Sequence, residues 1–132
     1  MPDLSVLALV LVGGGIGSVL RWGAGMAVVR RFGIAPLGTF LVNVSGSFAI
    51  GLLSTLLATA WQDRYDTALS ALLLTGILGG YTTFSSYELD ALGLAAGKDR
   101  RPFAAYWVGS IVAGLAAAYL GHQLAVILAG TS

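Results

Sequence analysis

The sequence predicts an all-α membrane protein with four transmembrane helices, and both its composition and its charge spacing indicate this class. Hydrophobic residues make up 57% of the 132 residues and charged residues only 10%, whereas an average soluble domain holds about 45–50% and 25%. The charges leave four uncharged runs, at 4–20, 32–62, 67–87 and 102–132. A membrane-spanning helix needs roughly 17–25 apolar residues, so four spans fit and we expect one transmembrane domain over 1–132.

The expected helices cover about residues 4–29, 37–60, 67–94 and 102–128. Pro36 and Pro102 stand at the start of the second and fourth helices, where a residue without an N–H donor is tolerated. Polar residues 62–66 are expected to form the loop between the second and third helices. Little chain then remains outside the four spans.

Small residues recur every four positions on three of these helices, as at Gly13 and Gly17, at Ser47 and Gly51, and along 109–121. This spacing lets helices approach closely in lipid. Four close-packed helices in a chain of 132 residues leave too little material to enclose a polar path. We therefore expect an oligomer.

The third expected helix contains a predicted break. Gly79 and Gly80 lie in the middle of an apolar stretch and are followed by hydroxyl and aromatic residues at 81–87. Backbone groups cannot stay unpaired in contact with lipid, so irregular backbone at membrane depth is buried in protein or lines a polar path. The pattern predicts an ion or substrate site at this break.

A polar stripe also marks the second expected helix. Thr39, Asn43 and Ser47 are spaced four residues apart and therefore share one helix face. The two hydroxyl groups can simply bond back to carbonyls of their own helix. The amide of Asn43 has two donors and one acceptor, so it either joins two helices or faces a wet cavity, and both alternatives remain open.

The residues after the glycine pair combine hydroxyl donors with aromatic rings: Thr82, Thr83, Phe84, Ser85, Ser86 and Tyr87. The edge of an aromatic ring is positive and attracts an anion without trapping it, and conduction requires such weak, multiple contacts. The alternative is that Phe84 and Tyr87 pack as ordinary helix core, three residues apart.

Arg21 lies inside the first expected helix, about 13 Å short of Arg30 at the rise of an α-helix. An arginine within a membrane indicates function by default. It could instead reach the interface or pair with Glu88 or Asp90. The functional alternative is a cation in a vestibule that raises the local anion concentration.

Enzyme signals are missing from the sequence. The single histidine, His122, has no carboxylate cluster near it in sequence, which argues against a metal site built on it. No G-x-S-x-G motif surrounds any serine, and a net charge of +1 offers no basic stripe for nucleic acid. We expect a protein that is not an enzyme.

Three motifs resemble those of the Fluc (CrcB) family of fluoride channels. They are Gly17-x-x-x-Arg21, Gly38-Thr39-x-x-x-Asn43 and Gly79-Gly80-x-Thr82-Thr83-Phe84-Ser85. The resemblance implies a passive, fluoride-selective channel of the cell membrane that lowers the toxicity of cytoplasmic fluoride. It also implies an antiparallel dual-topology dimer with two pores, and a structural sodium ion at its centre that is not transported.

The resemblance also assigns residues. Gly79 and Thr82 would give backbone carbonyls to sodium, Asn43 would contact the pore, and Arg21 would guard a vestibule. The remaining pore residues would be Phe84 and Tyr87 as the two aromatics, Thr39, Ser85 and Ser86 as a polar track, and Tyr106 beside the pore. Tyr87 departs from the phenylalanine that is common in the family, so the role of its hydroxyl is open.

Two alternatives accompany this interpretation. A small dual-topology multidrug cation exporter would need a carboxylate in the membrane, and the only acids inside the expected helices are Glu88 and Asp90. A non-transporting assembly factor would explain the small residues but not the cluster of hydroxyl and aromatic residues. Neither accounts for the whole pattern.

The distribution of basic residues indicates how the chain is oriented in the membrane, and therefore which kind of dimer it can form. The loops after the first and third helices hold five basic residues, Arg30, Arg31, Lys98, Arg100 and Arg101, whereas the opposite side holds only Arg64. The positive-inside rule therefore favours both termini outside. Two hypotheses remain for the assembly: an antiparallel homodimer, and a heterodimer with an oppositely oriented homologue.

Overall fold

The computed structural model describes residues 3–59 and 67–130, and within these ranges all regular structure is helical. Four stretches are long and apolar enough to cross a membrane: Leu4–Phe32, Ala35–Thr59, Ala68–Ala95 and Arg101–Ala129. The all-α class with four membrane-length spans is thereby confirmed. The expected helix end at Ala60 and the loop at 62–66, with Arg64, lie outside the described residues.

The first and last helices are longer than expected at their ends. α1 (Leu4–Phe32) continues past residue 29 and stops at Gly33, whose φ of 71° is left-handed. The Gly33 N–H donates to the Val29 carbonyl at 2.7 Å, which is a common way to end a helix. α6 (Arg101–Ala129) carries Pro102 in its first turn and ends in the same way at Gly130, with a φ of 67°.

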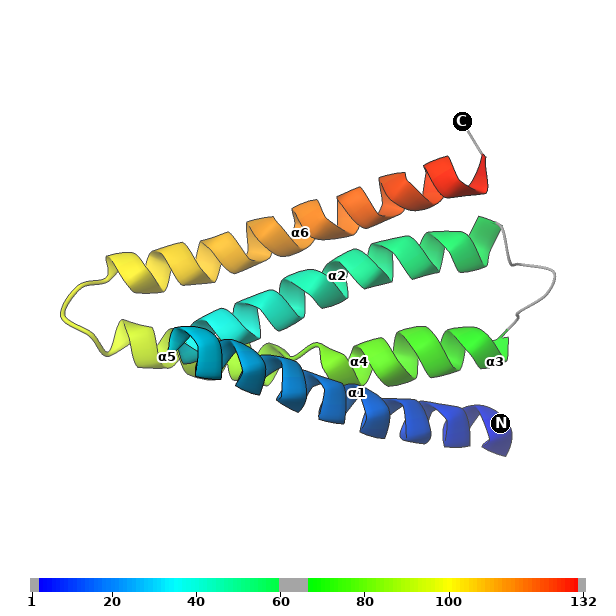
Figure 1. Cartoon of the computed structure of the whole chain (residues 1–132), viewed down its shortest axis with the longest axis horizontal. Coiled ribbons are helices and arrows are strands. Elements are labelled where there is room, and N and C mark those ends of the chain that lie inside the picture. Colours follow the sequence, from blue (N-terminus) through cyan, green and yellow to red (C-terminus); the bar gives the residue numbers. More distant parts are fainter. Residues whose placement is uncertain (1–2, 60–66, 131–132) are drawn as a thin grey trace.

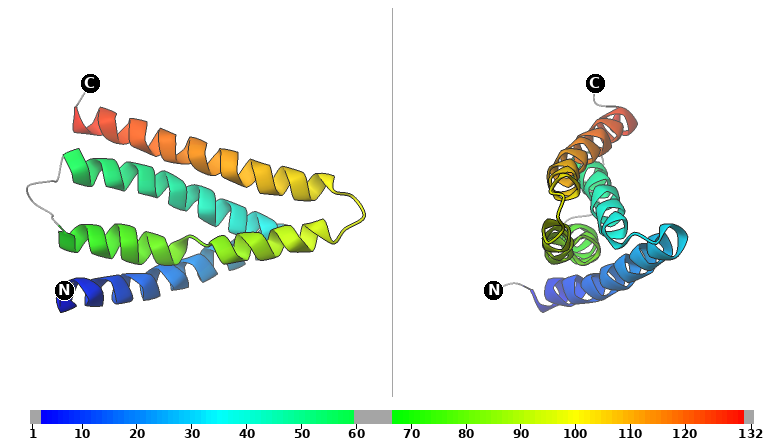
Figure 2. Two further views of the ribbon diagram at one scale, coloured as in Figure 1. Left: turned by 180° about the vertical axis from the view of Figure 1, so that it is seen from behind. Right: turned by 90° about the vertical axis from the view of Figure 1, so that its left-hand side faces the viewer.

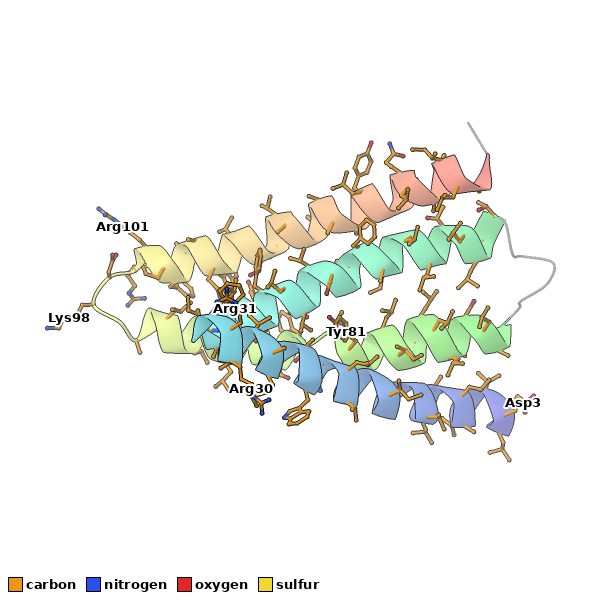
Figure 3. The ribbon with its side chains drawn as sticks, in the orientation of Figure 1. Asp3, Arg30, Arg31, Tyr81, Lys98 and Arg101 are labelled. Carbon is orange, nitrogen blue, oxygen red and sulfur yellow. The ribbon has the colours of Figure 1, made fainter. Side chains whose placement is uncertain are left out.

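The spans form a bundle in which α2 (Ala35–Thr59) packs against α6, and the first half of the third span packs against α1 (Figure 1, Figure 2). α1 begins and α6 ends at the same end of the bundle (Figure 1). Arg30, Arg31, Lys98 and Arg101 lie toward the opposite end from Asp3 (Figure 3). The charge asymmetry of the sequence is therefore an asymmetry between the two ends of the molecule.

Glycines let the helix backbones touch. A Cβ atom added at Gly17 would collide with the carbonyl oxygen of Ile77 and lie 2.8 Å from the Tyr81 nitrogen. A Cβ at Gly51 would collide with the Ala118 carbonyl in the same way. The obstacle in both cases is backbone, so the small-residue spacing corresponds to close helix packing at these positions.

The third span is divided into four elements. These are α3 (Thr67–Ser70), the π-helix η1 (Ala71–Leu78), α4 (Gly79–Tyr81) and α5 (Phe84–Ala95). Between α4 and α5, Thr82 has φ −75° and ψ 155°, and Thr83 has φ −148° and ψ 120°. Both residues are extended, so the helical path is interrupted there.

The sequence predicts the interruption at the glycine pair, but in the structure it lies after that pair, at Thr82 and Thr83. Gly79 is helical, with φ −63° and ψ −37°, and Gly80 lies within α4. A Cβ at Gly80 would collide with the Gly14 carbonyl of α1. Gly80 thus serves close packing, and the β-branched Thr82 and Thr83 adopt the extended conformation to which such residues are suited.

Candidate functional site

The side chain of Asn43, on α2, forms hydrogen bonds with the interrupted backbone of the third span. The Thr83 N–H donates to Asn43 Oδ1 at 2.8 Å, and Asn43 Nδ2 donates to the Thr83 carbonyl at 2.8 Å. Thr83 is only 8% exposed, so both of its backbone groups need partners. In a continuous helix the Thr83 N–H would bond the Gly79 carbonyl. The amide of Asn43 replaces that bond.

A second link joins α2 to the residue just before the interruption. The hydroxyl oxygens of Ser45 and Tyr81 lie 2.9 Å apart, and Ser45 Oγ donates to the Val42 carbonyl at 3.1 Å. Because the serine proton is used in that bond, the phenol of Tyr81 is the donor to Ser45. Tyr81 lies beside the interruption in Figure 3. α2 therefore binds both the residue before the interruption, through Ser45, and its second residue, Thr83, through Asn43.

Hydroxyl groups cap the helix that follows. Thr83 Oγ1 accepts a bond from the Ser86 N–H at 3.2 Å and donates to Ser86 Oγ at 3.1 Å. Ser85 Oγ lies 3.3 Å from the same oxygen. Thr82 Oγ1 instead donates back to the Leu78 carbonyl at 3.0 Å. Thr83 is therefore the N-cap of α5, and its hydroxyl connects Ser85 and Ser86.

The two aromatic residues of α5 differ in their surroundings. Phe84 is 74% exposed, whereas Tyr87 is 6% exposed. Their ring centroids are 5.8 Å apart, and the Tyr87 ring lies 5.5 Å from that of Tyr106. The Tyr87 hydroxyl donates to the Trp107 carbonyl of α6 at 2.8 Å. The hydroxyl that distinguishes Tyr87 from phenylalanine is thus bound to backbone.

Two cavities meet at these residues. One of about 270 Å³ is lined by Asn43, Ser47, Ile50, Thr82, Thr83, Phe84 and Tyr87. The other, of about 260 Å³, is lined by Asn43, Phe84, Tyr87, Glu88, Trp107, Ser110 and Ile111. Asn43, Phe84 and Tyr87 are common to both. The hydroxyl oxygen of Ser110 is buried and has no hydrogen-bond partner among the described residues.

A third cavity, of about 340 Å³, lies between α1, the start of α2, and α5, and its polar lining comprises Arg21, Thr39, Ser86 and Asp90. Arg21 Nη1 donates to the Thr82 carbonyl at 3.4 Å. The Tyr106 hydroxyl donates to Asp90 Oδ2 at 3.4 Å. The partner of Arg21 in the described part of the chain is therefore a backbone carbonyl, rather than the carboxylate of Glu88 or Asp90.

The expected site residues thus gather around one stretch of the third span. Ser47 shares the first cavity with Asn43, and Thr39 shares the third with Arg21 and Ser86. His122 lies apart from them. Its Nδ1 is 2.8 Å from Thr55 Oγ1, and the Thr55 hydroxyl donates to the Gly51 carbonyl at 2.9 Å. Within residues 3–59 and 67–130, no three His, Cys, Asp or Glu side chains cluster as metal ligands.

Sequence reasoning gave no place in the pore to three polar residues that line these cavities, Glu88, Asp90 and Ser110, and helical spacing was an available signal for the last two. Asp90 follows Ser86 by four positions, and Ser110 follows Tyr106 by four, so each pair shares a helix face. Glu88 lines the second cavity. The Trp107 carbonyl that binds Tyr87 has no signal in the sequence, because every residue carries a carbonyl.

Comparison with known proteins gives consistent matches over most of the chain. Residues 8–122 match the family described as "CrcB-like protein, Camphor Resistance (CrcB)". A "Fluoride-specific ion channel FluC 2" from Yersinia pseudotuberculosis serotype I (strain IP32953) is 53% identical over 115 residues, covering 86% of this chain and 91% of the relative. The protein of the same name from Brucella abortus biovar 1 (strain 9-941) is 52% identical over 126 residues, covering 95% and 97%. A "Fluoride-specific ion channel FluC" from Chloroflexus aurantiacus (strain ATCC 29366 / DSM 635 / J-10-fl) is 41% identical over 121 residues, covering 91% and 94%.

Proposed function

The chain belongs to the CrcB family, and on that premise we propose that it is a fluoride-selective ion channel, not an enzyme. As a multi-pass protein of the cell membrane, it would let fluoride leave the cell passively and so lower fluoride toxicity. The observation that carries the proposal is the identity of 52% over 95% of the chain to a protein named as a fluoride-specific channel. The cavities at Asn43, Phe84 and Tyr87 supply a site with suitable chemistry.

The donors around these cavities suit a small, strongly hydrated anion. One N–H of Asn43 is used by the Thr83 carbonyl, and an amide has two, so the second can face the cavities that Asn43 lines. The edges of the Phe84 and Tyr87 rings add positive character. Each contact is weak by itself, and several weak contacts let an ion enter and leave. These groups would replace part of the water around fluoride.

The third cavity supplies an approach to this region. Arg21 would raise the local concentration of anions, and Thr39 and Ser86 offer hydroxyl groups on the same lining. Ser85 and Ser86 are connected through Thr83, and Tyr106 joins the Tyr87 ring to Asp90. We assign Thr39, Ser85, Ser86 and Tyr106 to a polar track that leads to the two aromatic residues.

An antiparallel dimer is part of the proposal. Phe84 is 74% exposed beside the cavities, and a second chain would cover it and complete the path. The basic residues at one end of the bundle (Figure 3) oppose equal insertion in both orientations. The partner is therefore a second copy or an oppositely oriented homologue.

A topology experiment separates these two partners. The chain has no cysteine, so Ser132→Cys introduces a single label, at a position outside the described residues. The chain is expressed alone in intact cells and labelled from outside. Equal inward and outward populations with fluoride flux would support the homodimer, whereas one orientation without flux would support the paired homologue.

The residues at the interruption fit a structural sodium ion by their chemistry. The helical donor of the Gly79 carbonyl, the Thr83 N–H, is engaged by Asn43, and hard cations prefer oxygen ligands such as carbonyls freed at broken helices. Gly79 and Thr82 would hold the ion through main-chain oxygens, and two copies would double this set. When bound, sodium would add positive charge and join the two chains. Thr82→Ser should be tolerated, because the hydroxyl bond to Leu78 is kept.

Ion efflux from liposomes tests the function. The purified protein is reconstituted, and fluoride efflux is measured beside chloride efflux and the transport of a lipophilic cationic dye. Rapid fluoride efflux without chloride or dye transport is expected. Dye transport driven by a proton gradient would instead favour the cation exporter, for which Glu88 and Asp90 line cavities. No transport of any of the three, by a chain that the Ser132→Cys label shows in both orientations, would contradict both functions.

A further inference from the structure

Arg21 reaches the interruption because α1 lies directly on the backbone of the third span. Gly17 leaves no space for a side chain against Ile77 and Tyr81, and Arg21 is one helical turn further along the same face. Its Nη1 donates to the Thr82 carbonyl at 3.4 Å. A charged group thus stabilises a carbonyl that has left the regular helix.

The same oxygen is one of the proposed sodium ligands, so any effect of Arg21 on sodium rests on that proposed site. A hard cation lies about 2.3–2.6 Å from a carbonyl ligand, so sodium and the guanidinium could be at most about 6 Å apart if both kept this oxygen. At an effective dielectric constant of about 20, their repulsion would weaken sodium binding roughly 100-fold. Solvent screening of the half-buried arginine would reduce this effect to roughly tenfold.

We infer that Arg21 and the sodium ion compete for the Thr82 carbonyl oxygen. Without sodium, the guanidinium donates a hydrogen bond to this oxygen and stabilises the extended conformation of Thr82 and Thr83. When sodium binds, the guanidinium turns toward Asp90, which lines the same cavity of about 340 Å³. Arg21 thereby sets the sodium affinity of the site, in addition to any effect that its charge has on anions.

The test measures sodium binding rather than transport. The thermal unfolding midpoint of the purified protein is followed as sodium chloride replaces the chloride of a large organic cation at constant ionic strength. Arg21→Gln removes the charge and should lower the sodium concentration for half-maximal stabilisation by roughly tenfold. Arg21→Lys keeps the charge and should stay near the unaltered protein. Arg30→Gln, on the same helix near its end, is the matched control and should have no effect.

An unchanged or higher half-maximal sodium concentration in Arg21→Gln would overturn the inference. If that variant does not fold, Asp90→Asn tests the inference instead. This change removes the carboxylate toward which the guanidinium turns when sodium binds, so sodium binding should weaken several-fold. An unchanged sodium midpoint in Asp90→Asn would then contradict the inference. The absence of any sodium effect on the unaltered protein would overturn both the sodium site and the competition. Fluoride efflux from the same preparation tests the channel separately.

Discussion

The two halves of the third span are held in the bundle by different means. Before the interruption, η1 and α4 lie against α1 backbone to backbone, at positions where Gly13, Gly17 and Gly80 leave no room for a Cβ atom. After it, α5 is held by side chains, through the Tyr87 bond to α6 and the ring of Tyr106. The first half is thus packed closely against α1 at these glycines, whereas the second half lines cavities that carry polar side chains. Close packing and the proposed ion path thus lie in different halves of one span.

The largest expected effect is loss of folding from a single methyl group in the first half. Gly17→Ala would place a Cβ against the Ile77 carbonyl. Overpacking costs about 1–3 kcal/mol even where side chains can yield, and here the obstacle is backbone. We expect little monodisperse protein in size-exclusion chromatography. Gly15→Ala is the matched control, because nothing lies within 4 Å of a Cβ there. Equal yields of the two variants would remove the distinction between the halves.

The next largest effect concerns the joint between the halves. In Asn43→Asp, a carboxylate cannot donate to the Thr83 carbonyl, and a negative charge lies where fluoride should meet donors. An unsatisfied buried group costs about 1–3 kcal/mol, so we expect lower thermal stability and fluoride efflux reduced roughly 100-fold. Ser47→Ala, on the same face and the same cavity, should have a much smaller effect. Normal efflux in Asn43→Asp at neutral pH would show that Asn43 serves helix packing alone.

A smaller effect is expected for the exposed aromatic residue of the second half. Phe84→Ile keeps apolar bulk but removes the ring edge, whose interactions are worth about 0.5–1.5 kcal/mol. We expect fluoride efflux to fall roughly tenfold or more, with folding unchanged because Phe84 is 74% exposed. Phe32→Ile, on an exposed aromatic residue at the end of α1, serves as the control. Unaltered efflux in Phe84→Ile would contradict its place in the pore.

The smallest effect sharpens the contrast between Phe84 and Tyr87. Tyr87→Phe removes the bond to the Trp107 carbonyl, which should cost about 0.5–1.5 kcal/mol of stability. Fluoride efflux should be retained, because the hydroxyl is engaged by backbone. Thermal unfolding and efflux are measured on the same preparation. A loss of efflux at unchanged stability would mean that the hydroxyl acts on the anion itself.

Hydropathy is sufficient to predict the four spans, because lipid imposes the same length and polarity on each of them. The glycine pair places the interruption two to three residues too early. Such a pair is compatible with both a break and a close helix contact, and only the nearness of Gly14 to Gly80 shows which one applies. The sequence left two alternatives for Asn43, a link between helices and a place in a cavity wall. The structure contains both, because the amide binds the backbone of the third span and also lines a cavity.

Other features of the site have no signal, or a weak one, in the sequence. The distinction between Phe84 and Tyr87 depends on the Trp107 carbonyl, and the partner of Arg21 is likewise a carbonyl. Backbone partners are decided by how helices cross, which residue identity alone does not reveal. Asp90 and Ser110 could have been found from their spacing of four residues to Ser86 and Tyr106.

The polar second half of the third span has a consequence for how the chain enters the membrane during synthesis. The third span has a mean hydropathy of 1.3, against 1.8 or 1.9 for the other three, and it carries Glu88 and Asp90. Carboxylates in a membrane helix oppose insertion from the translocon, although less towards its end than the about 2.5–3.5 kcal/mol that they cost at its centre. By mean hydropathy, the third span is therefore the one whose transfer into lipid by itself is least favourable. Its insertion depends on α1 and α2, which are made earlier and already offer Gly17 and Asn43 as a template for its backbone.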